Sequence, residues 1–167
     1  MNPSPYTIRE ASFQDIDLIK ELCKQVWPAT YAPILDKGQL DYMMEWMYSS
    51  ASLERQIKEG CQFLLLYSKD KPVGYASYQL LHDQQYKLNK LYVLPALQGQ
   101  GAGRYFLSHI HEKIKAQQGQ FIELQVNRQN KARYFYEAMG YTIREEADIA
   151  VGNGYYMNDY IMVFALN

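Results

Sequence analysis

The chain has 167 residues, 48% of them hydrophobic and 21% charged, which is typical of one soluble globular domain. With 17 Lys and Arg against 18 Asp and Glu, the formal net charge is −1. This balance argues against nucleic acid or a membrane as the main partner, because both demand a basic surface. Two cysteines and three histidines predict neither a disulfide framework nor a metal site. No apolar run is long enough to span a bilayer and no secretion signal is recognisable, so we expect a cytoplasmic protein.

The first part of the chain predicts a short strand over residues 6–10 and then a helix. Ser12, with Asp15 three residues later, is typical of a helix start, and apolar residues recur behind it at helical spacing. Pro28 is expected to end this helix, because proline has no backbone N–H to donate.

Two further helices are predicted before the pattern changes. The second covers residues 38–48, where apolar side chains again recur at helical spacing. A third is expected to be capped by Ser50 or Ser52 and to stop at Gly60, since serine favours helix starts and glycine favours helix ends.

The second part of the chain alternates between strands and helices. Strands are predicted over residues 62–67, 73–81, 86–94, 121–126, 141–147 and 155–164. One helix opens at Gly103 or Arg104, and another covers residues 131–139 and is closed by Gly140. This order of elements predicts an α/β or α+β chain with a mixed sheet and helices on its faces.

The most informative segment is a glycine-rich turn between a strand and a helix, reading LPALQGQGAGR over residues 94–104. Gly99, Gly101 and Gly103 allow the backbone to approach a phosphate closely, and the start of the helix favours an anion. A diphosphate is therefore the expected ligand. A Walker loop needs lysine where Arg104 stands, and the dinucleotide fingerprint needs a third glycine at a spacing that is absent, so both are disfavoured. The alternative is a plain turn with incidental glycines.

This turn resembles the diphosphate loop of the GCN5-related N-acetyltransferases, which reads Gln/Arg-x-x-Gly-x-Gly/Ala. Gln98, Gly101 and Gly103 match that pattern in full. The resemblance covers nearly the whole chain and implies a single N-acetyltransferase domain over residues 1–167, with a mixed, mostly antiparallel twisted sheet of about seven strands and four or five helices. Residues 152–162 are similar to the bacterial branch that includes the PaiA-type polyamine acetyltransferases.

The resemblance also implies a binding site for acetyl-CoA, used as co-substrate without a metal. The strand segment Leu91, Tyr92 and Val93 is implied to hydrogen-bond the pantetheine arm. The diphosphate is implied to contact Gln98, Gly99, Gln100, Gly101, Ala102, Gly103 and Arg104.

One cofactor contact departs from the family pattern. The family usually has asparagine where this chain has Gln129, with Asn127 and Asn130 close by. Asn130 is the residue that we expect to contact CoA. Lys87 and Lys90 are further candidates, with Arg104, for contacts to phosphate.

A second signature lies at residues 132–141. It resembles the family's Ala-x-x-Phe/Leu-Tyr-x-x-x-Gly-Phe segment, with Tyr136 at the tyrosine whose hydroxyl lies near the acetyl-CoA sulfur in the family. A phenol with an ordinary pKa of about 10 stays protonated at neutral pH and can donate its proton to a leaving thiolate. Tyr136 is therefore the expected general acid. The alternative is that Tyr136 only packs, because Phe135 and Met139 belong to an apolar helix face.

The base that would deprotonate the amine has no clear candidate. Many members of the family carry glutamate on the strand before the loop, and that position is Asn89, which cannot accept a proton. His82, Asp83 and Glu123 are possible replacements, but each is more typical of a solvated residue. No general base is assigned, and His111 is expected at the surface.

Asp159 is the one candidate for a contact with the amine substrate. In the strand 155–164 it shares a face with Met157 and Ile161. A carboxylate in an apolar row is costly to bury unless a cation meets it, and a protonated amine would do so. The alternative is that Asp159 bonds a local turn or pairs with a nearby Lys or Arg.

The sequence therefore predicts an acetyl-CoA-dependent N-acetyltransferase in which a primary amine attacks directly in a ternary complex. The expected acceptor is a small molecule such as a polyamine. Two alternatives stay open: a catalytically silent CoA-binding or sensor module, and an acetyltransferase for protein N-termini or lysines. A homodimer is compatible with the sequence but is not required by it.

Overall fold

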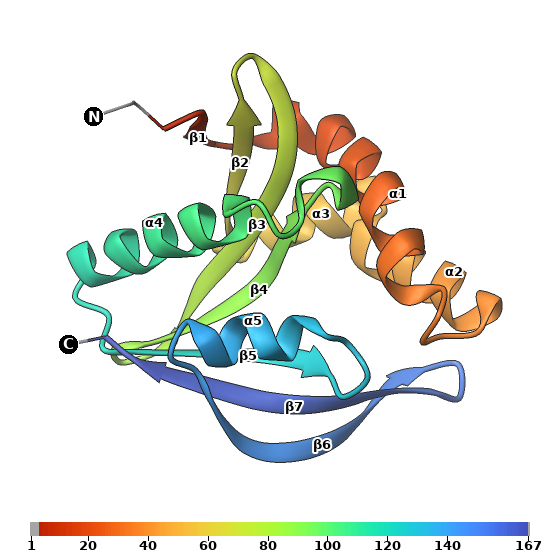
Figure 1. Ribbon diagram of the computed structural model, residues 1–167. Helices are drawn as coiled ribbons and strands as arrows, with labels where there is room; N and C mark the ends of the chain where they lie inside the picture. Colours follow the sequence, from red (N-terminus) through yellow and green to blue (C-terminus); the bar gives the residue numbers. More distant parts are fainter. Residues whose placement is uncertain (1–3, 167) are drawn as a thin grey trace.

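A computed structural model describes residues 4–166, which form one seven-stranded sheet in the order β1-β2-β3-β4-β5-β7-β6 (Figure 1). The strands are β1 (Tyr6–Glu10), β2 (Gln62–Ser68), β3 (Lys71–His82), β4 (Gln85–Val93), β5 (Phe121–Asn127), β6 (Thr142–Gly152) and β7 (Tyr155–Ala165). The helices are α1 (Ile16–Tyr31), α2 (Lys37–Tyr48), α3 (Ser50–Lys58), α4 (Ala102–Ala116) and α5 (Ala132–Ala138), with short 3-10 turns at η1 (Phe13–Asp15) and η2 (Pro95–Leu97). Only the β4–β5 pair is parallel among these strands. The predicted fold class is confirmed.

Two apolar cores hold the helices against the sheet. The first lies under α4 and α5, where Phe106, Leu107 and Ile110 are fully buried. The second joins α1, α2 and α3 to β2 and β3 and includes the fully buried Ile19 and Leu53. Burial of these apolar side chains is the main favourable term that fixes the layers.

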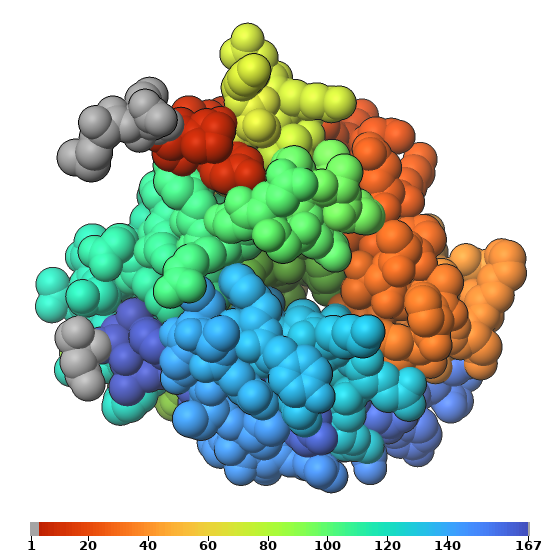
Figure 2. Space-filling view, in the orientation of Figure 1, coloured from red at the N-terminus to blue at the C-terminus, as the bar shows by residue number. Residues whose placement is uncertain are grey.

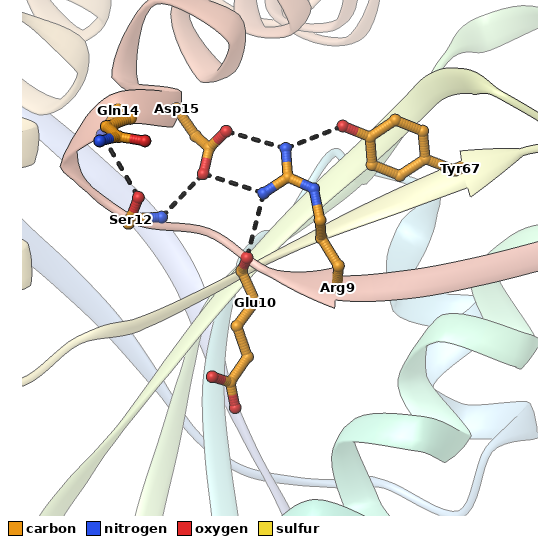
Figure 3. A network of polar contacts seen from close by, with 6 residues as sticks. All are labelled: Arg9, Glu10, Ser12, Gln14, Asp15 and Tyr67. Carbon is orange, nitrogen blue, oxygen red and sulfur yellow. Dashed lines mark hydrogen bonds and ion pairs between the residues drawn. The ribbon is translucent and has the colours of Figure 1, made fainter.

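The start of α1 is tied to the sheet by a polar network (Figure 3). Arg9 of β1 donates bonds of 2.8 and 3.0 Å to the two carboxylate oxygens of Asp15 and one of 3.0 Å to the Tyr67 hydroxyl of β2. Asp15 also accepts the backbone N–H of Ser12, completing the predicted capping box. The bonds from Arg9 lower the pKa of Asp15. The network orients α1, whose other end reaches the site described below.

The expected end of α1 at Pro28 is wrong, because the helix continues to Tyr31. The backbone N–H of Ala32 still donates to the Pro28 carbonyl at 3.0 Å. Beyond the proline, the ring of Tyr31 packs 4.4 Å from that of Trp27, and both approach Tyr92 of β4. These aromatic contacts stabilise the last turn and offset the loss of the one hydrogen bond that proline cannot make.

Two other helix starts differ from the expected residues. The cap of α3 is Ser49, not Ser50 or Ser52, because Ser49 has the extended backbone that a cap needs and accepts the N–H of Ser52. The helix α4 begins at Ala102, one residue before the expected start, after Gly101 in a left-handed conformation.

The hairpin of β6 and β7 is longer than expected and reaches α2. The strand β6 runs to Gly152, where the expected strand ended at residue 147, because β7 pairs with it along most of its length. Near the hairpin tip, the Tyr42 hydroxyl of α2 donates to the Val151 carbonyl at 2.6 Å, and Gln39 donates to the Tyr156 carbonyl at 2.7 Å. The hairpin thus closes one side of the space between α2 and the sheet.

Within residues 4–166, no helix is long and apolar enough to cross a membrane. In the same part of the chain, no three His, Cys, Asp or Glu side chains lie together as a metal site would require.

Candidate active site

The site is built around a fork between β4 and β5. The two strands pair over residues 85–88 and 121–124 and then diverge (Figure 1). A bulge places Asn89 at the fork, since Ser77 of β3 pairs with Lys90 while the next residue of β3 pairs with Leu88. Beyond the bulge, β4 keeps β3 as its only partner among the described strands, so one edge of Leu91–Val93 is open to a ligand.

The glycine loop lies at the end of β4 and opens α4. Gly99 and Gly101 have φ angles of +80° and +86°, and a Cβ atom at either would meet nothing within 4 Å. The backbone N–H groups of Ala102, Gly103 and Arg104 have no acceptor among residues 4–166. Free N–H groups at a helix start, beside glycines that leave open space, suit the phosphate groups of a nucleotide.

The loop is held to the strand that precedes it. The amide of Gln98 donates to the Val93 carbonyl at 3.3 Å, and that of Gln100 donates to the Ala96 carbonyl at 3.0 Å. The Arg104 side chain is exposed on the first turn of α4. The space-filling view shows a hollow that is bounded by this loop, by α5 and by α1 (Figure 2).

Lys90 is not at the glycine loop, so its expected role in phosphate binding is wrong. Its Nζ atom donates to Gln56 of α3 at 2.6 Å and lies over the rings of Tyr48 and Phe63. Burial lowers the pKa of Lys90 to about 8. The bulge at Asn89 turns this side chain toward α3.

Tyr136 lies on α5 at the inner side of the fork. The side chain is 8% exposed, and its ring packs edge-on against those of Phe135 and Tyr141. Its hydroxyl makes no hydrogen bond within residues 4–166, and burial raises the pKa of the phenol well above its usual value. The group is therefore protonated at any physiological pH. The helix touches the glycine loop, since a Cβ at Gly103 would lie 3.4 Å from the Phe135 ring.

The three candidate amides before α5 have different surroundings. Asn130 accepts the Ala132 N–H at 2.9 Å at the start of the helix. Burial raises the pKa of Tyr31, and hydrogen bonds with Tyr92 and Asn130 oppose that rise. Asn127 accepts the N–H of Gln129 at 2.8 Å, while the Gln129 side chain is exposed. Asn130 is the amide among these three that bonds the first turn of α5, whereas Asn127 lines the pocket described next.

On the side of α1 and α2, the fork opens into a pocket of about 200 Å³, which we call the acceptor pocket. Its walls are aromatic and apolar side chains, and its floor is polar. The wall residues include Trp27, Tyr31, Trp46, Tyr92 and Met157, and the floor includes Lys87, Asn89, Gln125, Asn127 and Asp159. The hydroxyls of Tyr31 and Tyr92 are joined by a hydrogen bond of 3.0 Å.

Asp159 is the buried carboxylate of this pocket. It is 1% exposed, and its Oδ2 atom has no hydrogen-bond partner in the described part of the chain. Arg128 donates to the Asp159 backbone carbonyl, but its guanidinium pairs with the Asp148 carboxylate at 2.7 Å. Burial raises the pKa of Asp159 to about 6, and the charges of Arg128 and Lys87 oppose that rise.

The other candidate bases are poorly placed. The Glu123 carboxylate accepts a bond of 2.6 Å from Gln85, and His82 and Asp83 lie exposed at the β3–β4 turn. Asn89 lines the acceptor pocket, but its side chain is an amide.

The expected surface position of His111 is wrong. The imidazole is 8% exposed, lies 2.7 Å from the Tyr141 hydroxyl and stacks on Phe164. The apolar periodicity of α4 does not predict this burial, because the polar partner of His111 is Tyr141, which precedes β6 and is distant in the sequence. Burial lowers the pKa of His111 to about 4.

A model of the acetyltransferase (GNAT) domain family matches residues 35–161. An uncharacterised N-acetyltransferase of Mycobacterium bovis is 25% identical over 151 residues, covering 89% of this chain and 96% of the relative. A [ribosomal protein bS18]-alanine N-acetyltransferase of Haemophilus influenzae is 25% identical over 128 residues, covering 77% of this chain and 84% of the relative.

Among solved structures, the PaiA N-acetyltransferase of Thermoplasma acidophilum in complex with coenzyme A superposes with a TM-score of 0.80 at 22% identity, covering 96% of this chain and 98% of that one. A GCN5-related N-acetyltransferase of Rhodopseudomonas palustris reaches a TM-score of 0.83 at 17% identity, covering 99% of both chains. At these identities, both show the shared fold. The fork, the glycine loop and the family match define a GNAT-fold enzyme. The chain belongs to the GNAT family and is an N-acetyltransferase.

Proposed function

We propose that residues 1–167 act as one domain that transfers the acetyl group of acetyl-CoA to a primary amine in a ternary complex. One observation carries the proposal: the fork between β4 and β5 lies between a glycine loop with free backbone N–H groups and a pocket that ends in a buried carboxylate. The transferred group would lie where the two meet. As the sequence predicts, we place this enzyme in the cytoplasm.

The proposed cofactor site follows the free backbone groups. The diphosphate would accept N–H groups of the loop from Gln98 to Arg104, including Gly99, Gln100, Gly101, Ala102 and Gly103. The pantetheine arm would add to the open edge of Leu91, Tyr92 and Val93, as an extended peptide adds to a sheet edge. Asn130, at the start of α5, would contact the same arm.

Tyr136 is the proposed general acid. When the carbon–sulfur bond breaks, sulfur leaves with a negative charge and needs a proton. The Tyr136 phenol keeps its proton at neutral pH because burial raises its pKa. A covalent acetyl-cysteine is not part of the proposal, because Cys23 is 1% exposed and burial raises the pKa of its thiol to about 12.

The proposed acceptor is a small primary amine that enters as a cation. Aromatic faces in the pocket wall attract an ammonium group, and Asp159 supplies a negative charge at the floor. The volume of the pocket, about 200 Å³, favours a slender molecule such as a polyamine.

The second candidate acceptor is the α-amine of a polypeptide. A polar depression lined by Arg128, Gln129 and Tyr156 adjoins the acceptor pocket, with which it shares Gln39 and Asn127. A chain end could lie along it with its amine at Asp159. The similarity to an enzyme that acetylates the alanine of a ribosomal protein points in the same direction.

The test is release of free thiol from acetyl-CoA with a panel of acceptors: polyamines, diamines, monoamines, amino acids, short peptides with free N-termini and an N-blocked peptide containing lysine. We expect turnover with a small cationic amine. Turnover with free N-termini alone would replace the first candidate by the second. Binding of acetyl-CoA without turnover of any amine would overturn the proposed transfer.

A further inference from the structure

The carboxylate of Asp159 is buried without a partner that would offset its charge. Oδ2 has no hydrogen bond within residues 4–166, and the nearest guanidinium, that of Arg128, is paired with Asp148. An unpaired buried charge is costly, and such groups in native structures call for a functional explanation. The pocket that Asp159 lines gives it access to a ligand.

Asp159 lies beside the fork. It pairs with Asn127 at the end of the β5–β7 ladder, so the two side chains lie on the same face of the sheet and both line the acceptor pocket. That pocket also contains Asn89 at the bulge, where β4 leaves β5. An amine in contact with Asp159 would therefore lie beside the fork.

Tyr31 connects Asp159 with Tyr136. Burial is the main cause of the raised pKa of both tyrosines; the charge of Asp159 adds to the rise at Tyr31, and Tyr31 adds to the rise at Tyr136. Tyr31 also lines the acceptor pocket together with Asp159. Its own hydrogen bond to Tyr92 holds it across the fork. The carboxylate comes from β7 and the phenol from α5.

We propose that Asp159 is the catalytic base of the transfer, accepting the proton of the ammonium group that reacts. This inference rests on the proposed acetyl transfer and deepens it by naming the proton acceptor. The proton acceptor would thus lie on β7, two strands away in the sheet order from Asn89 on β4, the position where many family members carry glutamate. It adds a chemical role to the contact with a protonated amine that the sequence suggested for Asp159.

The proton balance is complete with the residues of this chain. The ammonium gives one proton to the Asp159 carboxylate, and the free amine forms a carbon–nitrogen bond at the acetyl carbonyl. The carbon–sulfur bond then breaks, and Tyr136 gives its proton to the leaving sulfur. The nitrogen loses its second proton to the Tyr136 phenolate, which restores the phenol. Asp159 releases the first proton to water at the pocket mouth, so each turnover frees one proton.

The electrostatics of the pocket fit this role. With its pKa raised to about 6, Asp159 is ionised at neutral pH and is a stronger base than an exposed carboxylate. The charged and titratable groups that line the pocket with it are Lys87, Lys90 and Tyr92 from β4 and Tyr31 from α1, and the charge of Arg128 after β5 also acts on it.

The experiment compares wild type, Asp159→Asn and the control Asp70→Asn, which removes one charge from an exposed turn. kcat and both KM values are measured from pH 5 to 9 with the best amine of the acceptor panel. We expect kcat of Asp159→Asn to fall about 100-fold with an unchanged acetyl-CoA KM. The wild-type kcat/KM for the amine should decline below a pKa near 6, and the variant should lack this decline. In a further variant, Asp159→Ala, added formate should restore part of kcat, because formate can supply the missing carboxylate.

A measurement without an amine keeps the proposal testable if a variant fails to fold. In wild-type protein labelled with ¹³C at the aspartate Cγ, the Asp159 signal should titrate near pH 6. Titration at the ordinary value overturns the proposal. So does a variant with wild-type kcat, or one in which only the amine KM rises while the pH profile keeps its shape, because that result indicates binding of a cation alone. If wild type acetylates no amine in the panel, the proposed function itself fails, and this inference fails with it.

Discussion

The imidazole of His111 on α4 lies 2.7 Å from the hydroxyl of Tyr141, the residue that follows α5 and precedes β6. The Tyr141 ring also packs edge-on against Tyr136, at 5.6 Å between ring centres. The helix that begins at the glycine loop is therefore linked through two aromatic contacts to the proposed general acid. Both His111 and Tyr141 are buried, so this link is part of the core that positions the site.

The first prediction concerns stability at acidic pH. The pKa of His111 in the folded protein is about 4, below its value of 6.5 in an unfolded chain. The stability associated with neutral His111 is fully present above pH 6.5 and is lost as pH falls toward 4, by about 3 kcal/mol in total. His111→Gln removes this titration. In urea unfolding between pH 4.5 and 8, the free energy of unfolding should fall less steeply with acidification in the variant. Equal slopes would show that His111 does not contribute.

The second prediction concerns Asp159, whose pKa is shifted in the opposite direction to that of His111. The pKa of Asp159 in the folded protein is about 6, above its ordinary 3.8. Its contribution to the stability of the fold is therefore most favourable below pH 3.8 and is lost as pH rises through 6. Asp159→Asn should therefore unfold at higher urea concentration than wild type at pH 8, by up to about 3 kcal/mol, with little difference near pH 4. A less stable variant at pH 8 would mean that the carboxylate has a structural partner.

The third prediction tests the glycine loop. Gly101→Val places a branched side chain into the open space where the diphosphate is proposed to bind, and acetyl-CoA affinity should fall at least about tenfold, or about 1.4 kcal/mol. Gly60→Val is a matched control, because Gly60 also has a positive φ, of +102°, and open space around it, but lies after α3. Calorimetric titration with acetyl-CoA measures both. Equal affinities in the two folded variants would remove the loop from the cofactor site.

The fourth prediction concerns Tyr136. Phenylalanine at this position keeps the ring but removes the proton, so kcat of Tyr136→Phe should fall by about 100-fold while acetyl-CoA affinity hardly changes. Tyr134→Phe is the control on the same helix, since its side chain is 60% exposed and should leave kcat unchanged. If Tyr136→Phe retains the wild-type kcat, the residue only packs.

The fifth prediction concerns the network that orients α1. Asp15→Asn removes the charge that Arg9 contacts through two hydrogen bonds, and the free energy of unfolding at pH 7 should fall by about 1 kcal/mol. Because Arg9 lowers the pKa of Asp15, this contribution is present at neutral pH and is lost as pH falls toward the folded pKa. The difference between wild type and variant should therefore shrink with acidification, and a constant difference would contradict the ionic contribution.

Much of the fold, and the elements that carry part of the candidate site, follow from short stretches of sequence. The alternation of strands and helices, the glycine loop at Gly99–Gly103 and the position of Tyr136 on a helix were all predicted, and the structure places them as expected at the level of elements. Such features depend on residues that are consecutive or one helical turn apart, so local propensity and motif spacing are enough to specify them.

The rest depends on contacts between residues far apart in the chain. Aromatic packing carries α1 past Pro28, the register of β3 against β4 sets the bulge that turns Lys90 away from the loop, and Tyr141 gives His111 a buried partner. The same holds for Asp159, whose isolation in the acceptor pocket arises because β5 and β7 pair while β4 diverges. Register, burial and the absence of a partner are properties of strands brought together by folding, and no local pattern of residues encodes them.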